Sequence, residues 1–151
     1  MKKLLIILLA VLAIDTGIFI TLAKVIKSQR LLHQEILTLI ESELGKLRED
    51  ASLTQREHEL EKLFKCSKYP IKEKVECYVY TPTEEGKKYC GRNYGQIIVI
   101  NENFKDLDGV LLHELCHAAL NESGIDSHEH NNPEWIYLIN YIKDLGYTVC
   151  I

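Results

Sequence analysis

The strongest chemical pattern in the sequence is a glutamate flanked by two histidines, HELCH at residues 113–117. Residues four apart on an α-helix are displaced by about 40° around its axis and about 6 Å along it. His113 and His117 would therefore present their imidazoles to the same point in space. Two imidazole nitrogens supply half of a tetrahedral zinc shell, so the spacing predicts a site for one zinc ion.

Glu114 occupies the position from which a carboxylate can act as a general base. It lies about 100° around the helix from His113, too far aside to ligate comfortably but within reach of a water on the metal. Zinc lowers the pKa of such a water to about 7, and Glu114 would take its proton as the water attacks a carbonyl carbon. The pattern predicts hydrolysis of peptide bonds in a protein or peptide substrate.

A third protein ligand must come from outside the H-E-x-x-H pattern. The longer metzincin pattern H-x-x-G-x-x-H is absent, because Leu120 and Ser123 stand where it requires Gly and His. The residues that follow offer three candidates, namely His128, His130 and Glu134.

The elements that must position these residues predict an α+β fold. Hydrophobic residues recur at helical spacing over residues 107–120, and Asp106 or Asp108 can cap the start of this helix. Pro133 opens a last helix that ends at Gly146, on which Trp135 is expected to be a core anchor. Three short runs rich in β-branched and aromatic residues predict a small antiparallel sheet beside the motif helix: ECYVY at 76–80, KKYC at 87–90 and QIIVIN at 96–101.

The five cysteines show no C-x-x-C pair, so no zinc-ribbon spacing is present. If residues 76–90 form a hairpin that turns at residues 82–85, Cys77 lies opposite Cys90, and a disulfide could join them in an oxidising compartment. Cys66 and Cys150 are a looser second pair, and the alternative is that all five are reduced core thiols. Cys116, inside the motif, is expected to be a core thiol.

The N-terminal residues differ in composition from the rest of the chain. Two apolar runs together give the 20 residues 4–23, which is long enough to cross a bilayer as a helix. Asp15 near the middle costs roughly 3 kcal/mol on insertion scales, which several Leu and Ile at about −0.5 kcal/mol each can offset. We expect a membrane anchor at residues 1–24. A cleaved signal peptide and an ordinary buried helix are the alternatives.

Residues 25–65 are predicted to form a helical stalk and N-terminal helices, and residues 66–151 the domain that holds the metal. Positive charges flank both ends of the apolar segment, so they fix its orientation poorly. We expect a single-pass protein whose domain is extracytoplasmic, the alternatives being secretion after signal cleavage and a domain that faces the cytoplasm. One apolar face of the stalk, at spacings of three and four, is formed by Leu32, Ile36, Ile40, Leu44 and Leu47.

The segment from about Tyr89 to Ile142 resembles the SprT-like metalloprotease family, which includes bacterial SprT and the Spartan-type proteases. The resemblance covers roughly a third of the chain, and its most specific elements are HELCHA and an H-x-x-P-E-W tail. The matching elements, in order, are a strand ending in Asn (QIIVIN), the motif helix (HELCHAAL), the loop IDSHEH and PEW.

This resemblance implies that His130 is the third zinc ligand. The family leaves about a dozen residues between its second and third histidines, and 12 residues separate His117 from His130, against 10 for His128. Asn131 stands where the family usually has Gly, which keeps His128 as an alternative beside Glu134. The four-cysteine ribbon and the DNA- and ubiquitin-binding tail of relatives have no counterpart here, so repair of DNA–protein crosslinks is not carried over.

Together the patterns predict a zinc metalloendopeptidase of the SprT-like kind, tethered to a membrane through its N-terminal helix. The net charge of −4 indicates no nucleic-acid partner. One alternative is a non-catalytic zinc-binding or scaffold module anchored in the membrane. Another is a tethered binding protein whose histidines hold no metal. Glu114 favours the enzyme, since a structural zinc site has no use for a base beside the metal.

Overall fold

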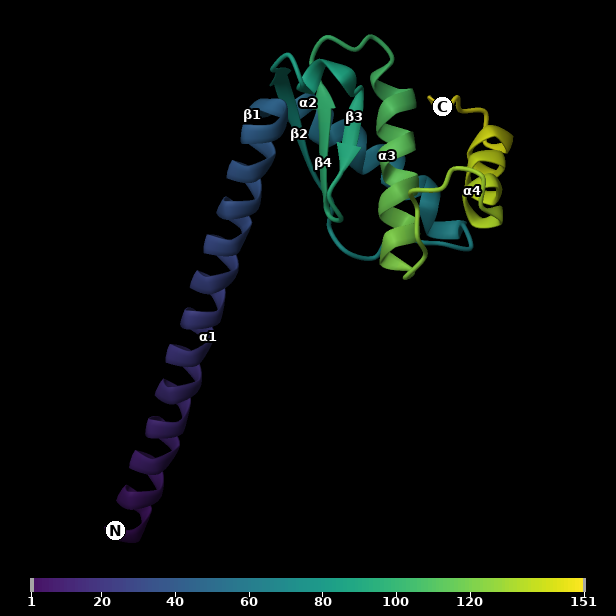
Figure 1. Ribbon diagram of the computed structural model, residues 1–151. Helices are drawn as coiled ribbons and strands as arrows, with labels where there is room; N and C mark the ends of the chain where they lie inside the picture. Colours follow the sequence, from purple (N-terminus) through teal and green to yellow (C-terminus); the bar gives the residue numbers. More distant parts are fainter. Residues whose placement is uncertain (1, 151) are drawn as a thin grey trace. The chain divides into compact units, whose positions relative to one another are not determined.

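The computed structural model describes the backbone of residues 2–150 and the side chains of residues 21–150 (Figure 1). The chain divides into two compact units, residues 1–40 and residues 41–151. No helix in the described part is both long and apolar enough to cross a membrane. Residues 1–20, most of the predicted anchor, lie outside the described side chains, so the anchor stays a prediction.

A single helix, α1 (Lys2–Leu44), leads into the second unit. The helix ends at Leu44. The next residue, Gly45, has a φ of 131°, which a residue with a side chain rarely adopts. A Cβ at Gly45 would also lie 2.0 Å from the carbonyl oxygen of Thr81. The prediction that Leu47 extends the helical face was therefore wrong, because Leu47 lies in strand β1 (Gly45–Glu49).

The second unit is an α+β domain, which is the fold class that the sequence predicted. Its sheet has four strands, whereas the sequence predicted three. After β1 come α2 (Ala51–Glu61), the 3₁₀ turn η1 (Lys62–Cys66) and β2 (Glu76–Pro82). The turn η2 (Gly86–Lys88), β3 (Gly91–Asn93) and β4 (Ile97–Asn101) follow. The last elements are α3 (Leu107–Glu122) and α4 (Pro133–Asp144), both close to their predicted bounds.

The sheet is mixed, so the prediction that it is antiparallel throughout was wrong. Its strand order is β1-β2-β4-β3, in which β2 and β4 run parallel while both outer pairs are antiparallel. The predicted strand at residues 87–90 is absent. The Thr83 hydroxyl accepts a hydrogen bond from the Gly86 N–H, and the i,i+3 pairs Glu84–Lys87 and Glu85–Lys88 favour a helical turn there.

The hairpin predicted for residues 76–90 is absent, and the next two strands, β3 and β4, form a hairpin instead. Gly95 has a φ of 78°, and the Asn93 side chain bonds both the N–H and the carbonyl of Gly95. Gly91 pairs with Ile100 and Asn93 with Ile98. This hairpin places β3 at the edge of the sheet next to α3.

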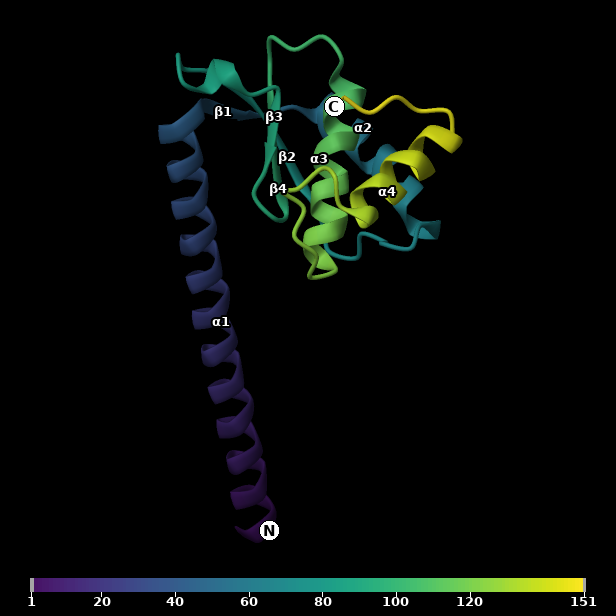
Figure 2. The same ribbon diagram turned by 45° about the vertical axis from the view of Figure 1, so that its right-hand side comes forward.

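One face of the sheet carries the main hydrophobic core, against which α2, α3 and α4 pack. Figure 2 shows the three helices on the same side of the sheet. Side chains of α2, η1 and the following loop, among them Leu53, Phe64 and Tyr69, belong to this core. Residues 51–65 had been predicted to form part of the stalk and N-terminal helices instead. Among the largest buried side chains of the cluster are Leu60, Phe64, Ile98, Ile100, Leu111, Leu115, Trp135 and Leu138.

Candidate metal centre

Helix α3 carries three of the predicted site residues toward one pocket. The Asp106 side chain caps the helix by accepting a hydrogen bond from the Gly109 N–H, as one of the two predicted caps. The Nε2 atoms of His113 and His117 lie 3.0 Å apart, as expected for residues one turn apart on one helix face. The predicted pairing of these two imidazoles is present.

His130 completes the cluster from the loop that follows α3. Its Nε2 lies 3.2 Å from Nε2 of His117, and the ligand atoms of the three histidines lie within 4.8 Å of one another. Asn132 closes the loop, because its side chain donates to the Asp126 carbonyl and accepts from the Trp135 N–H at the start of α4. The Asp126 carboxylate accepts from the His128 N–H in the same loop.

The other two candidates for the third ligand lie apart from this cluster. His128 lines the same pocket as His117, but its side chain is not one of the three that converge. Glu134 lies in the first turn of α4, where a carboxylate is favoured by the helix dipole. The geometry therefore brings together His113, His117 and His130.

The hydrogen bonds of the imidazoles leave their Nε2 lone pairs facing one another. Nδ1 of His113 lies 2.7 Å from the Cys150 carbonyl oxygen, which can only accept, so this nitrogen carries the proton. His117 forms a hydrogen bond with the backbone of Ser127 that favours a protonated ring, as a carbonyl acceptor does. In the neutral rings, Nε2 is then a bare acceptor. A cation between them satisfies both lone pairs.

Burial keeps these imidazoles in the neutral form that a metal requires. Desolvation lowers the pKa of His117 to about 3, and the neighbouring histidines lower it further in the same direction. Desolvation is also the main reason that the pKa values of His113 and His130 are lowered. The chemistry of this donor set, three neutral imidazoles, fits a zinc ion.

Trp135 forms the floor of the cluster. Its side chain is 2% exposed, which agrees with its prediction as a core anchor. The indole also stacks on the His130 ring, with centroids 4.3 Å apart and planes inclined by 19°, and lies 4.6 Å from the His117 ring. Trp135 thereby restricts the orientation of the one histidine that comes from a loop.

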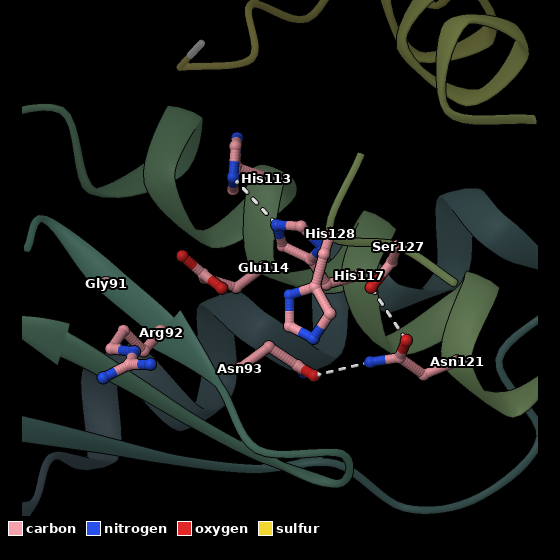
Figure 3. A pocket seen from close by; sticks show the side chains of 9 residues that line it. All are labelled: Gly91, Arg92, Asn93, His113, Glu114, His117, Asn121, Ser127 and His128. Atoms are coloured by element: carbon pink, nitrogen blue, oxygen red, sulfur yellow. Dashed lines mark hydrogen bonds between the residues drawn. The ribbon is translucent and has the colours of Figure 1, made fainter. Parts of the chain in front are cut away.

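Glu114 lies in the pocket beside the histidines, on the side of strand β3 (Figure 3). It is 5% exposed, and burial raises its pKa to about 8, while the charge of Arg92 opposes that rise. A divalent cation at the three histidines would favour the charged carboxylate in the same way. Its position agrees with a group that exchanges a proton.

Strand β3 contributes residues that the sequence pattern did not identify. A methyl group at Gly91 would lie 3.1 Å from Oε1 of Glu114 and 2.7 Å from Cγ1 of Val110, so a residue without a side chain suits this position. The pocket has a volume of about 170 Å³ and is open to solvent. It is lined by Gly91, Arg92, Asn93, His113, Glu114, His117, Asn121, Ser127 and His128.

Two hydrogen bonds join the three segments that surround this pocket (Figure 3). The Asn121 side chain on α3 donates to Oδ1 of Asn93 on β3 at 3.1 Å. Ser127 in the loop donates to Oδ1 of Asn121 at 2.7 Å. The edge strand, the helix and the loop are thus held to one another at this pocket.

The cysteines do not pair as the predicted hairpin required. All five lie in the described part of the chain and are free thiols. Cys77 is buried in β2 with Ile98 as its register partner, because the residues that follow β2 do not turn back along it. Cys116 is fully buried, in agreement with a core thiol. Cys90 and Cys150 instead line a common pocket next to His113.

No family model, curated protein or solved structure matches this chain. The site is accordingly interpreted from its own geometry.

Removing the Cys150 carbonyl tests how much the end of the chain contributes to the metal centre. In a chain that ends at Val149, Nδ1 of His113 loses its acceptor, and we expect zinc affinity to fall by about 10- to 100-fold. Competition with a chromophoric chelator measures this affinity. Cys150→Ala is the matched control, because it keeps the carbonyl and should bind zinc as the wild type does. Unchanged affinity in the shortened chain would contradict this role.

Proposed function

We propose that this protein is a zinc-dependent metalloendopeptidase, tethered to a membrane by its N-terminal helix. The observation that carries the proposal is the convergence of three imidazoles, two of which line an open pocket together with the buried carboxylate of Glu114. The resemblance of the segment 89–142 to SprT-like proteases, carried by HELCHA and the H-x-x-P-E-W tail, agrees with it, and membership of that family is part of the proposal. We further propose that the domain is extracytoplasmic.

In this proposal His113, His117 and His130 hold one zinc ion. The ion would polarise the carbonyl of the scissile peptide bond and lower the pKa of the attacking water. Glu114 takes the proton from that water and later gives it to the nitrogen of the leaving amine. Its burial suits this exchange, because a carboxyl group whose pKa lies near neutrality can both accept and release a proton.

The Cys150 carbonyl and Trp135 position the ligands. The carbonyl fixes the His113 tautomer, so that Nε2 remains the ligating atom. The stacked indole orients His130 and excludes water from one side of its ring. The protein thereby supplies three oriented ligands and one base.

Reconstitution of the full-length protein in detergent tests the proposal. We expect metal-free protein to leave a library of fluorogenic peptides intact, and one equivalent of Zn²⁺ to restore cleavage. Zinc binding without cleavage would overturn the enzyme and leave the scaffold module, in which His128 could close the shell as a fourth ligand. Failure to bind zinc would overturn both.

A further inference from the structure

A second group of metal-binding side chains lies on α2, away from the three histidines. Oε1 of Glu57 is fully enclosed and has no hydrogen-bond partner, the one such side-chain atom among the described residues. The residue is 2% exposed. A buried carboxylate oxygen without a partner is unfavourable unless a proton or a cation neutralises it.

The neighbours of Glu57 are further ligands rather than counter-charges. Glu61 follows one turn later on the same face of α2, and His58 lies beside both. One ligand atom from each of the three residues lies within 4.8 Å of the others. Nδ1 of His58 is 3.7 Å from a Glu61 carboxylate oxygen. Glu57 is buried, Glu61 is half-buried and His58 is exposed, so an ion can reach the group from solvent.

The surroundings disfavour a bare negative charge on Glu57, so a proton or a cation is favoured there. Burial, and then the charge of Glu61, raise the pKa of Glu57 to about 7. The Cys77 thiol on β2 faces the same two carboxylates, which together with its burial raise its pKa. Lys74 opposes the rise at Glu57 only weakly, because its ammonium is 83% exposed and lies 3.9 Å from Glu76.

We propose that Glu57, His58 and Glu61 form a second divalent-cation site, independent of the histidine centre. Two carboxylate oxygens and one imidazole nitrogen suit Zn²⁺ or Mn²⁺, and water completes the shell. The ion replaces the proton that the two carboxyl groups would otherwise share. All three ligands lie on α2, and an ion that binds them only in the folded helix stabilises the fold by mass action.

The test uses Zn²⁺ alone and a full-length protein whose first site has been removed. The double variant His113→Ala/His117→Ala, stripped with chelator, should still bind one zinc by elemental analysis and titration calorimetry. Its melting temperature should rise on addition of zinc. Adding His58→Ala or Glu61→Gln should weaken this binding at least 10-fold. His58 is largely exposed, so its replacement leaves the fold intact.

Glu59→Gln is the matched control, since Glu59 lies on the same helix but pairs with Arg56. It should leave both the bound zinc and the zinc-dependent rise in melting temperature unchanged. A double variant that binds no zinc would overturn the second site and show that Glu57 and Glu61 share a proton. Equal loss of binding in the Glu59 control would also overturn it, because the effect would then reflect helix charge alone.

Discussion

If the protein is the proposed peptidase, we expect Glu114→Gln to lose peptide cleavage while the zinc stays bound. The amide has the shape of the carboxyl group but cannot take up the proton of the attacking water. General-base catalysis contributes about 10²- to 10⁴-fold, so cleavage should fall by at least the lower figure. The Glu114 side chain is 5% exposed, and burial raises its pKa, so the uncharged carboxyl group is favoured there. An uncharged amide of the same shape should therefore be tolerated at this position.

The measurement is cleavage of a fluorogenic peptide by wild type and Glu114→Gln, with zinc content determined on the same samples. Glu134→Gln is the matched control, because this carboxylate lies outside the histidine cluster and should affect neither quantity. Cleavage at the wild-type rate in Glu114→Gln would show that another group acts as the base. Loss of zinc in this variant would instead make Glu114 a ligand.

The second large effect is expected from His130→Ala, which should remove the zinc of the histidine centre and cleavage together. Removal of an imidazole whose Nε2 lies 3.2 Å from that of His117 leaves two protein ligands. The loss of affinity should exceed the about 10- to 100-fold that removal of a ligand's hydrogen-bond partner costs. Trp135 would then face a gap where the His130 ring was stacked.

His128→Ala provides the comparison, because this histidine belongs to the same loop as His130 and lines the pocket that His113 and His117 line. We expect it to keep the zinc of the histidine centre, as measured by elemental analysis after dialysis in chains that also carry Glu61→Gln, which removes the second site. The reverse pattern, with zinc lost in His128→Ala and kept in His130→Ala, would assign the third ligand to His128. Zinc retained in both variants would point to Glu134.

Helix α3 and its H-E-x-x-H pattern could be predicted from sequence, because the residues that specify them lie close together in the chain. The H-E-x-x-H spacing, the Asp106 cap and the Asn132-Pro133 start of α4 each act within one or two helical turns. The choice among His128, His130 and Glu134 could not be made in this way. It depends on a loop whose course is fixed by the hydrogen bond from the Asn132 side chain to the Asp126 carbonyl.

The sheet was predicted less well, for a reason visible in the strand QIIVIN. All five residues of β4 are buried, and an uninterrupted apolar run is typical of a central strand covered on both faces. β4 therefore lacks the alternation of apolar and polar residues that is typical of a strand with one face exposed to solvent. Its parallel pairing with β2 needs a crossover through residues 83–96, and the strand propensities do not encode that crossover.

Two contributions to the site have no signature in the sequence. The acceptor for His113 is a main-chain carbonyl, which every residue possesses. The vacant space that Gly91 leaves beside Glu114 is recognised only once β3 lies against α3. Both depend on contacts between residues far apart in the chain.

The hydrogen bond from His113 to Cys150 would also couple the proposed metal to the docking of the segment that contains Cys150, here called the tail. The Cys150 N–H is bonded to the Gly109 carbonyl, so the tail is attached to α3 at two points of one residue. By reciprocity, whatever factor the docked tail adds to zinc affinity, zinc adds to the docking equilibrium of the tail. The ratio of zinc affinities between the chain with Cys150 and the one ending at Val149 therefore also measures how much more firmly Cys150 would be docked once the ion is bound.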